Sequence, residues 1–96
     1  MMLPTLDEFK QAQQRIAALL SKTPLERSER LSNYFKADVY LKREDLQQVR
    51  SYKIRGAFNK LLTLSQESKV DRVICASAGN HAQGVALSCS TLNIHG

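Results

Sequence analysis

The sequence predicts an α/β protein in which short strands alternate with amphipathic helices. Two segments, residues 38–42 and 72–76, have the composition of strands, and each precedes a segment with helical periodicity. The order strand, helix, strand, helix is typical of a parallel sheet flanked by helices. Two strands are too few for such a sheet, which needs further neighbours and cover on both faces. We therefore expect the 96 residues to be the truncated, N-terminal part of a larger α/β domain.

The first predicted helix lies near the N-terminus. Thr5 and Glu8 form a T-x-x-E capping box, which satisfies two of the free N–H groups at a helix start. Apolar residues then recur at roughly helical spacing, at Phe9, Ile16, Ala17, Leu19 and Leu20. We expect this helix to end at Ser21, because the following Thr23-Pro24 pair disfavours helical backbone before the proline.

A second short helix and the first strand come next. Ser28 is a suitable N-cap for a helix that carries Leu31, Tyr34 and Phe35 on one side. Residues 38–42 alternate between polar and apolar as a half-buried strand does. Residues 43–50 are polar and lack periodicity, which indicates a loop.

The third predicted helix begins after that loop, with Ser51 as its N-cap. Its buried side is expected to carry Ile54, Ala57, Phe58, Leu61, Leu62 and Leu64. Lys53 then falls in the first turn, where the positive end of the helix dipole disfavours a charged amine. The neutral amine is the form that acts as a nucleophile, so Lys53 is a candidate for covalent catalysis. The alternative is an ordinary solvated lysine.

A second strand and a fourth helix complete the chain. The apolar run at residues 72–76 predicts a strand buried on both faces, which makes Cys75 a buried thiol. The segment SAGNHAQG at 77–84 then changes from a turn of small residues into a helix. One face of this helix is expected to carry Ala82, Val85, Ala86, Cys89 and Leu92.

The turn SAGNH at 77–81 lies at the carboxyl end of a strand, where open α/β sheets bind ligands. Its small residues allow a close approach, and the free N–H groups of the helix start attract a carboxylate or phosphate. A P-loop is excluded, because Val85 and Ala86 follow Gly84 where Lys and Ser or Thr are required. A plain turn capped by Asn80 is the alternative.

Composition excludes several classes of function. The N-terminus lacks a signal-peptide pattern and no apolar run approaches the roughly 18 residues that span a bilayer, so we expect a cytoplasmic protein without a membrane partner. Cys75, Cys89, His81 and His95 match neither a disulfide framework nor a metal-ligand spacing. The net charge of +5 would suit nucleic acid, but acidic residues are mixed with the basic ones, which favours a solvated surface.

Two motifs together resemble a known family. SYKIRGA at 51–57, followed by SAGNHAQG at 77–84, is similar to the fold-type II pyridoxal-phosphate enzymes. The preceding YLKREDLQ at 40–47 narrows the resemblance to the threonine/serine dehydratases, above all their biosynthetic threonine dehydratase branch. The resemblance extends over residues 23–92 and implies the parallel sheet with flanking helices of that fold type.

The resemblance also implies a site. Pyridoxal 5'-phosphate is the cofactor, bound covalently by Lys53, with Tyr52 beside it and the Asn80 amide bonded to its ring oxygen. The substrate carboxylate is held at the helix start by Ser77, Gly79, Asn80 and His81. No metal is expected.

The implied reaction is the dehydration and deamination of L-threonine to 2-oxobutanoate and ammonia, as in isoleucine biosynthesis. The partner is then a small amino acid, and the full-length protein is expected to be a homo-oligomer. In the family, the glycine-rich loop for the cofactor phosphate comes later than residue 96. We therefore expect these residues to be the N-terminal portion of the catalytic domain and to be inactive alone.

Other functions remain open. Serine racemases have a second serine where this chain has Ala78, which disfavours racemisation, and no SVKDR-like segment of the cysteine synthases is present. Serine dehydration is not distinguished from threonine dehydration. A non-catalytic basic module using RSYKIR is the alternative from another class; salt-dependent nucleic-acid binding that requires Arg50 and Arg55 would favour it.

Overall fold

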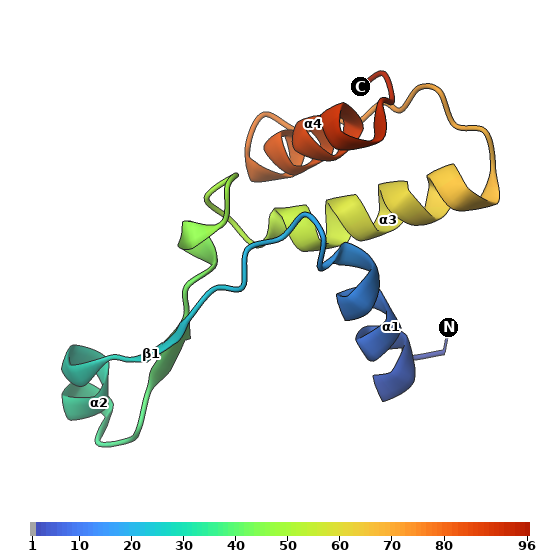
Figure 1. The fold of residues 1–96 in the computed structure, drawn as a ribbon. Helices are drawn as coiled ribbons and strands as arrows, with labels where there is room; N and C mark the ends of the chain where they lie inside the picture. Colours follow the sequence, from blue (N-terminus) through green and yellow to red (C-terminus); the bar gives the residue numbers. More distant parts are fainter. Residues whose placement is uncertain (1) are drawn as a thin grey trace.

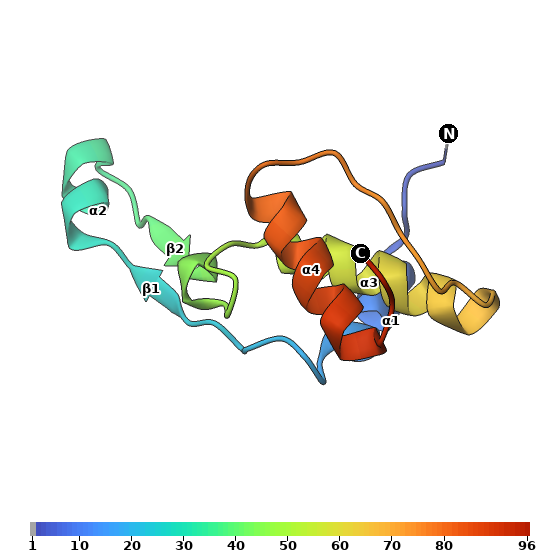
Figure 2. The ribbon, with the colours of Figure 1, turned by 90° about the horizontal axis from the view of Figure 1, so that it is seen from above.

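The computed structural model describes residues 2–96, and two helices that pack side by side form its body (Figures 1 and 2). In chain order the elements are α1 (Leu6–Ile16), β1 (Leu25–Arg27), α2 (Glu29–Phe35), β2 (Tyr40–Lys42), a 3-10 helix (Glu44–Leu46), α3 (Lys53–Glu67) and α4 (Asn80–Leu92). α4 lies along α3, α1 packs against the first half of α3, and the segment from β1 to β2 projects away as an arm.

The core lies mainly between α3 and α4. Ala57 and Leu61 of α3 meet Val85 and Cys89 of α4 and the following Ile94 in one apolar cluster. A second cluster joins α1 to α3 through Ile16, Ile54 and Phe58. The predicted apolar spacing of α3 is thus confirmed at the positions that are most buried, whereas Ala86 of α4, expected on the buried face, is exposed.

α1 begins as predicted and ends early. Thr5 Oγ1 accepts from the Glu8 N–H at 3.3 Å and the Thr5 N–H donates to Glu8 Oε2 at 2.6 Å, which confirms the capping box. The helix ends at Ile16 rather than at Ser21. The N–H groups of Leu19 and Leu20 both bond to the Ile16 carbonyl, which tightens the end of the helix into turns.

The prediction of a parallel sheet from residues 38–42 is wrong for the described residues. β1, which periodicity did not predict, pairs with β2 in an antiparallel ribbon with Leu25 opposite Lys42 and Arg27 opposite Tyr40. The two strands run in opposite directions, so α2 is not the crossover of a parallel strand-helix-strand unit.

The predicted strand at residues 72–76 is not formed either. An isolated parallel bridge joins Arg72 to His95, while Ile74 is 93% exposed and Cys75 is exposed, not a buried thiol. A buried parallel strand needs a strand on each side. Within residues 2–96, the only β-pairing of residues 72–76 is the bridge between Arg72 and His95.

α2 lies at the tip of the arm. Ser28 Oγ accepts from the Leu31 N–H at 3.3 Å, so the predicted N-cap is confirmed. Tyr34 and Phe35, expected on one packed side, are mostly exposed. Their rings contact each other edge to face, with the ring centres 4.9 Å apart. The helix instead buries Ser32, whose hydroxyl accepts from Val39 N–H at 3.0 Å.

Candidate active site

The start of α3 differs from the prediction. Tyr52, not Ser51, is the N-cap. A residue whose side chain caps a helix normally has extended backbone. Tyr52 has helical dihedral angles instead, and its side chain makes no capping hydrogen bond. Arg50 is left-handed (φ 60°) and turns the chain just before the helix. Ser51 is consequently buried, 9% exposed, and among the described residues its hydroxyl has no hydrogen-bond partner.

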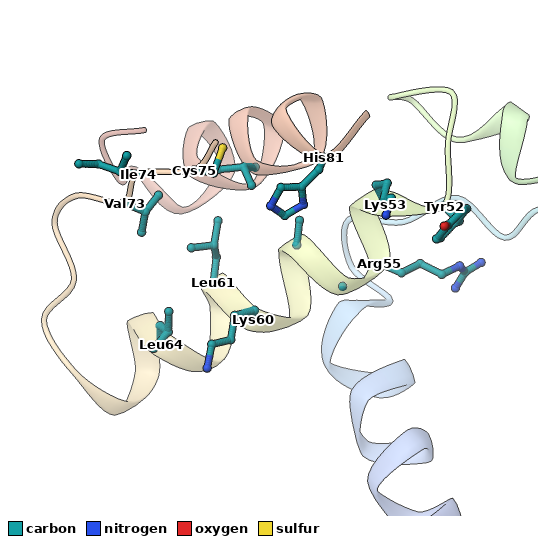
Figure 3. A pocket seen from close by; sticks show the side chains of 13 residues that line it. Tyr52, Lys53, Arg55, Lys60, Leu61, Leu64, Val73, Ile74, Cys75 and His81 are labelled. Atoms are coloured by element: carbon teal, nitrogen blue, oxygen red, sulfur yellow. The ribbon is translucent and has the colours of Figure 1, made fainter. Parts of the chain in front are cut away.

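Lys53 is the first residue of α3, in the first turn as expected. Its side chain is exposed, and Nζ lies 5.2 Å from the centre of the Tyr52 ring, a cation–π distance. Figure 3 shows this amine at the same end of α3 as His81, which projects from the start of α4 toward α3. The fold thus places Lys53, Tyr52 and His81 around one space.

That space is a groove of about 660 Å³ between α3, the segment before α4 and the first turns of α4. Its lining includes Lys53, Ala57 and Leu61 from α3, Ile74 and Cys75 from the preceding segment, and His81 and Val85 from α4. The walls are mainly apolar, and Lys53 and His81 supply polar groups among them (Figure 3). This is the arrangement of a small-molecule site, an apolar concavity with a few polar groups.

The SAGNH turn is capped by Ser77 and not by Asn80. Ser77 Oγ accepts from the N–H groups of Gly79 and Ala82, both at 3.3 Å. Asn80 is the first residue of α4 and Gly79 its N-cap. Because the Ser77 oxygen accepts both bonds, its hydroxyl proton remains available to an acceptor. The N–H groups of Asn80 and His81, at the start of the helix, have no acceptor within it.

The structure brings some of the expected site residues together and leaves others apart. Lys53, Tyr52 and His81 line the groove, whereas Ser77, Gly79 and Asn80 are exposed on the turn beside His81 and do not line it. Their roles in binding cofactor or substrate stay predictions.

Gly84 joins the two motifs, and sequence reasoning missed it. A Cβ on Gly84 would lie 3.3 Å from Ala57 Cβ, from the Ile54 nitrogen and from the Lys53 carbonyl carbon. A glycine within a helical pattern is a signal of such close packing. Gly56 on α3 differs, because nothing among the described residues lies within 4 Å of a Cβ placed there.

An ion pair beside the groove was also missed. Arg55 Nε donates to Glu44 Oε2 at 2.8 Å and Nη2 donates to Oε1 at 2.7 Å. The Glu44 side chain is 14% exposed. The Arg55 guanidinium, helped by the Thr23 hydroxyl and opposed by burial, lowers the pKa of Glu44 to about 2. The loop of residues 43–50 is therefore partly ordered by a contact with α3.

Residues 2–96 contain neither a metal-binding cluster nor a membrane-spanning helix. No group of three or more His, Cys, Asp or Glu side chains is arranged to hold a metal ion. In the same part of the chain, no helix has the length and apolar character needed to cross a membrane.

Comparisons with known proteins identify the family to which the chain belongs. Residues 16–96 match the family described as pyridoxal-phosphate dependent enzyme, and the chain belongs to that family. Among curated proteins, it is 55% identical over 85 residues to the L-threonine dehydratase biosynthetic IlvA of Bacillus subtilis. It is 58% identical over 85 residues to the protein of that name from Mycobacterium leprae. Each alignment covers 88% of this chain and 20% of the relative.

Solved structures agree. The chain superposes on a crystal structure of the T.th. threonine deaminase with a TM-score of 0.84 and 37% identity, covering 96% of this chain and 32% of the other. It superposes on maize serine racemase with a TM-score of 0.87 and 32% identity, covering 97% and 28%. The resemblance to pyridoxal-phosphate enzymes is confirmed, and the chain spans about a fifth of the length of the curated relatives it matches.

Proposed function

We propose that this chain is the N-terminal portion of a catalytic domain that dehydrates and deaminates L-threonine to 2-oxobutanoate and ammonia, with pyridoxal 5'-phosphate bound at Lys53. The observation that carries the proposal is the groove in which Lys53 and His81 face the same apolar space. Relatives named L-threonine dehydratase support the choice of substrate.

The residues present fit the cofactor. A volume of about 660 Å³ lies within the range of small-molecule sites, roughly 300–1,000 Å³. Apolar walls suit an aromatic ring, and the exposed Lys53 amine can condense with an aldehyde. The buried hydroxyl of Ser51, two residues before this lysine, has no partner within residues 2–96. When bound, the cofactor's ring supplies an electron sink for the substrate's α-carbon.

The remaining roles belong to this chain's side chains. Lys53 accepts the proton from the substrate α-carbon once its amine is free. The Ser77 hydroxyl and the N–H groups of Asn80 and His81 hold the substrate carboxylate at the positive end of α4. The Asn80 amide orients the cofactor, and Tyr52 packs beside it. Gly79 donates its own N–H to Ser77, so it contributes by leaving the approach open.

Fold and assembly are part of the proposal. Further polypeptide is expected to complete a parallel sheet in which residues 72–76 form a strand, as the parallel bridge at Arg72 already suggests. The proposal also includes homo-oligomeric assembly, which the resemblance implies, and the cytoplasmic location expected from the sequence.

The experiment uses the longest polypeptide that the gene encodes, incubated with pyridoxal phosphate and reduced with borohydride. Peptide mapping should find the pyridoxyl group on Lys53, and the purified protein should release 2-oxobutanoate from L-threonine. Lys53→Ala should lose both, whereas Lys60→Ala, a control on the same groove, should keep them. A pyridoxyl group on another lysine, or an active Lys53→Ala variant, would overturn the proposal.

Serine chemistry is the second candidate, because the chain also superposes on a serine racemase. Ala78 on the turn argues against racemisation, since it offers no hydroxyl for proton transfer. The same protein should therefore leave the optical rotation of L-serine unchanged apart from any conversion to pyruvate. A steady appearance of D-serine would reverse this preference.

A further inference from the structure

The first turn of α3 carries positive charge at its positive end. Lys53 and Arg55 both lie in this turn, which contains no acidic residue and has no side-chain cap. Cations at a helix N-terminus are unfavourable, because they add to the partial positive charge of the free N–H groups. The helix start that carries the proposed cofactor lysine therefore needs a negative group from elsewhere in the chain.

Glu44 supplies that negative group. Its carboxylate accepts two parallel bonds from Arg55, at 2.8 and 2.7 Å, the bidentate geometry that fixes direction as well as distance. The Glu44 side chain is 14% exposed, whereas the carboxylates that pair with Arg27 and Arg43 are 49 to 80% exposed. Exposed pairs contribute little to the fold, so the pair at Glu44 stands apart.

Glu44 is itself held from the other side. The Thr23 hydroxyl donates to Oε1, and Gln47 Nε2 donates to Oε2 at 3.3 Å. Gln47 is 1% exposed and binds the backbone of Ser21 twice, accepting from its N–H at 3.1 Å and donating to its carbonyl at 3.0 Å. Besides Arg55, the carboxylate is thus held by Thr23 and by Gln47, which is itself bonded to Ser21.

The direction of Arg55 relates this anchor to the groove. Side chains two positions apart on an α-helix leave it roughly 200° apart. Figure 3 shows Arg55 extending away from His81 at the start of α3, although Arg55 is also among the residues that line the groove. When Glu44 holds Arg55 in this direction, rotation of the first turn is restricted with Lys53 facing the groove.

We propose that Glu44 and Arg55 are a positioning pair for Lys53. Their bidentate contact fixes the rotation of the first turn of α3 and so places the amine opposite His81. This role requires no contact of the pair with cofactor or substrate. The inference rests on the proposed function of Lys53.

The test compares Glu44→Gln with Asp45→Asn in the longest encoded polypeptide. Asp45 is the next residue of the same 3-10 helix, and its carboxylate is exposed and paired with Arg43. Glu44→Gln should lower kcat for L-threonine by roughly 10- to 100-fold with a smaller change in KM, and should lower the fraction of Lys53 fixed by borohydride at subsaturating cofactor. Asp45→Asn should match wild type.

Arg55→Lys separates geometry from charge. Lysine keeps the positive charge but cannot make two parallel bonds, so a positioning role predicts the Glu44→Gln behaviour. Thermal unfolding measured alongside identifies a merely structural role, which lowers the midpoint but leaves kcat of the folded protein unchanged.

The outcomes are distinguishable. Absence of a pyridoxyl group on Lys53 in the wild-type protein would refute the proposed function. A wild-type protein labelled on Lys53, together with a Glu44→Gln variant equal to it in kcat and labelling, would refute the positioning role alone.

Discussion

Helix caps show which contacts can be predicted at the scale of single residues. Thr5, Glu8 and Ser28 were predicted correctly because each bonds to backbone three residues away, so the sequence pattern contains both partners. Ser51 was predicted wrongly because its role depends on the left-handed Arg50 before it, and no local rule places an arginine there.

The same distinction holds for the candidate site. The place of Lys53 in the first turn follows from local periodicity and was predicted. The contact of Glu44 with Arg55 was not predicted, because it joins a loop to a helix across 11 residues. Only the tertiary structure shows which of the many charged residues is buried against which partner.

Acid should weaken the fold through Glu44. Its pKa is lowered from 4.5 to about 2 by Arg55, so the ion pair stabilises the protein fully above about pH 4.5 and loses this contribution as the pH falls toward 2. At neutral pH, Glu44→Gln should reduce the free energy of unfolding by roughly 1–2 kcal/mol. Urea unfolding of both proteins at a series of pH values measures the difference.

The sign of the pH dependence is the critical result. The gap between wild type and Glu44→Gln should narrow as the pH falls from 4.5 to 2, because the wild-type carboxylate becomes protonated and the variant has none. Arg43 also lowers the pKa of Asp45, but that pair is exposed, so Asp45→Asn should show the same trend with a smaller gap. A gap that stays constant down to pH 2 would show that Glu44 is not held ionised by Arg55.

At the scale of elements, the helices were predicted better than the strands. α3 and α4 follow from apolar spacing, since a helix satisfies its own backbone and needs only one face to match a neighbour. A strand depends on a partner elsewhere in the chain. Residues 72–76 and β2 both have strand-like composition, yet β2 pairs antiparallel with β1, and residues 72–76 make one bridge.

Two glycines on the packed pair of helices should respond differently to alanine. Gly56→Ala on α3 should raise the free energy of unfolding by roughly 0.5–1 kcal/mol, because helix propensity improves and no atom lies within 4 Å. Gly84→Ala gains the same propensity but places a methyl group 3.3 Å from backbone atoms of α3. We expect the free energy of unfolding of Gly84→Ala to be lower than that of Gly56→Ala by at least about 1 kcal/mol.

Chemical denaturation of both variants, in the longest encoded polypeptide, gives this difference directly. Because the atoms nearest Gly84 include the Lys53 carbonyl carbon, Gly84→Ala should also weaken cofactor binding. Equal stabilities for the two variants would mean that α4 does not approach α3 as closely as the structure shows.

The whole molecule is open for its length. Its radius of gyration is 16.0 Å and its extents are 51 × 30 × 26 Å, whereas a compact domain of this size has a radius near ~12 Å. The arm accounts for much of this, since it projects from the body (Figure 2). Large apolar side chains are exposed both on the arm, as at Tyr34, and on the segment before α4, as at Ile74.

Such a shape predicts that the 96 residues alone differ from the longest encoded polypeptide. With so much apolar surface uncovered, the short chain should unfold at lower urea concentration, bind a fluorescent apolar dye and show no threonine dehydratase activity. The longer protein should unfold cooperatively and hold the cofactor. Urea titrations, dye fluorescence and 2-oxobutanoate release are measured on both. A dye-silent, active short chain would contradict this prediction.

Residues 72–76 also determine how the short chain behaves at high concentration. Ile74, Cys75 and Ala76 are apolar and exposed, and within residues 2–96 their backbone N–H and C=O groups take part in no strand pairing. Such an edge is a template for intermolecular β-pairing and aggregation. Expressed without further polypeptide to cover this edge, the chain is expected to accumulate in inclusion bodies. Its solubility would therefore indicate whether residues 72–76 are paired with neighbouring strands.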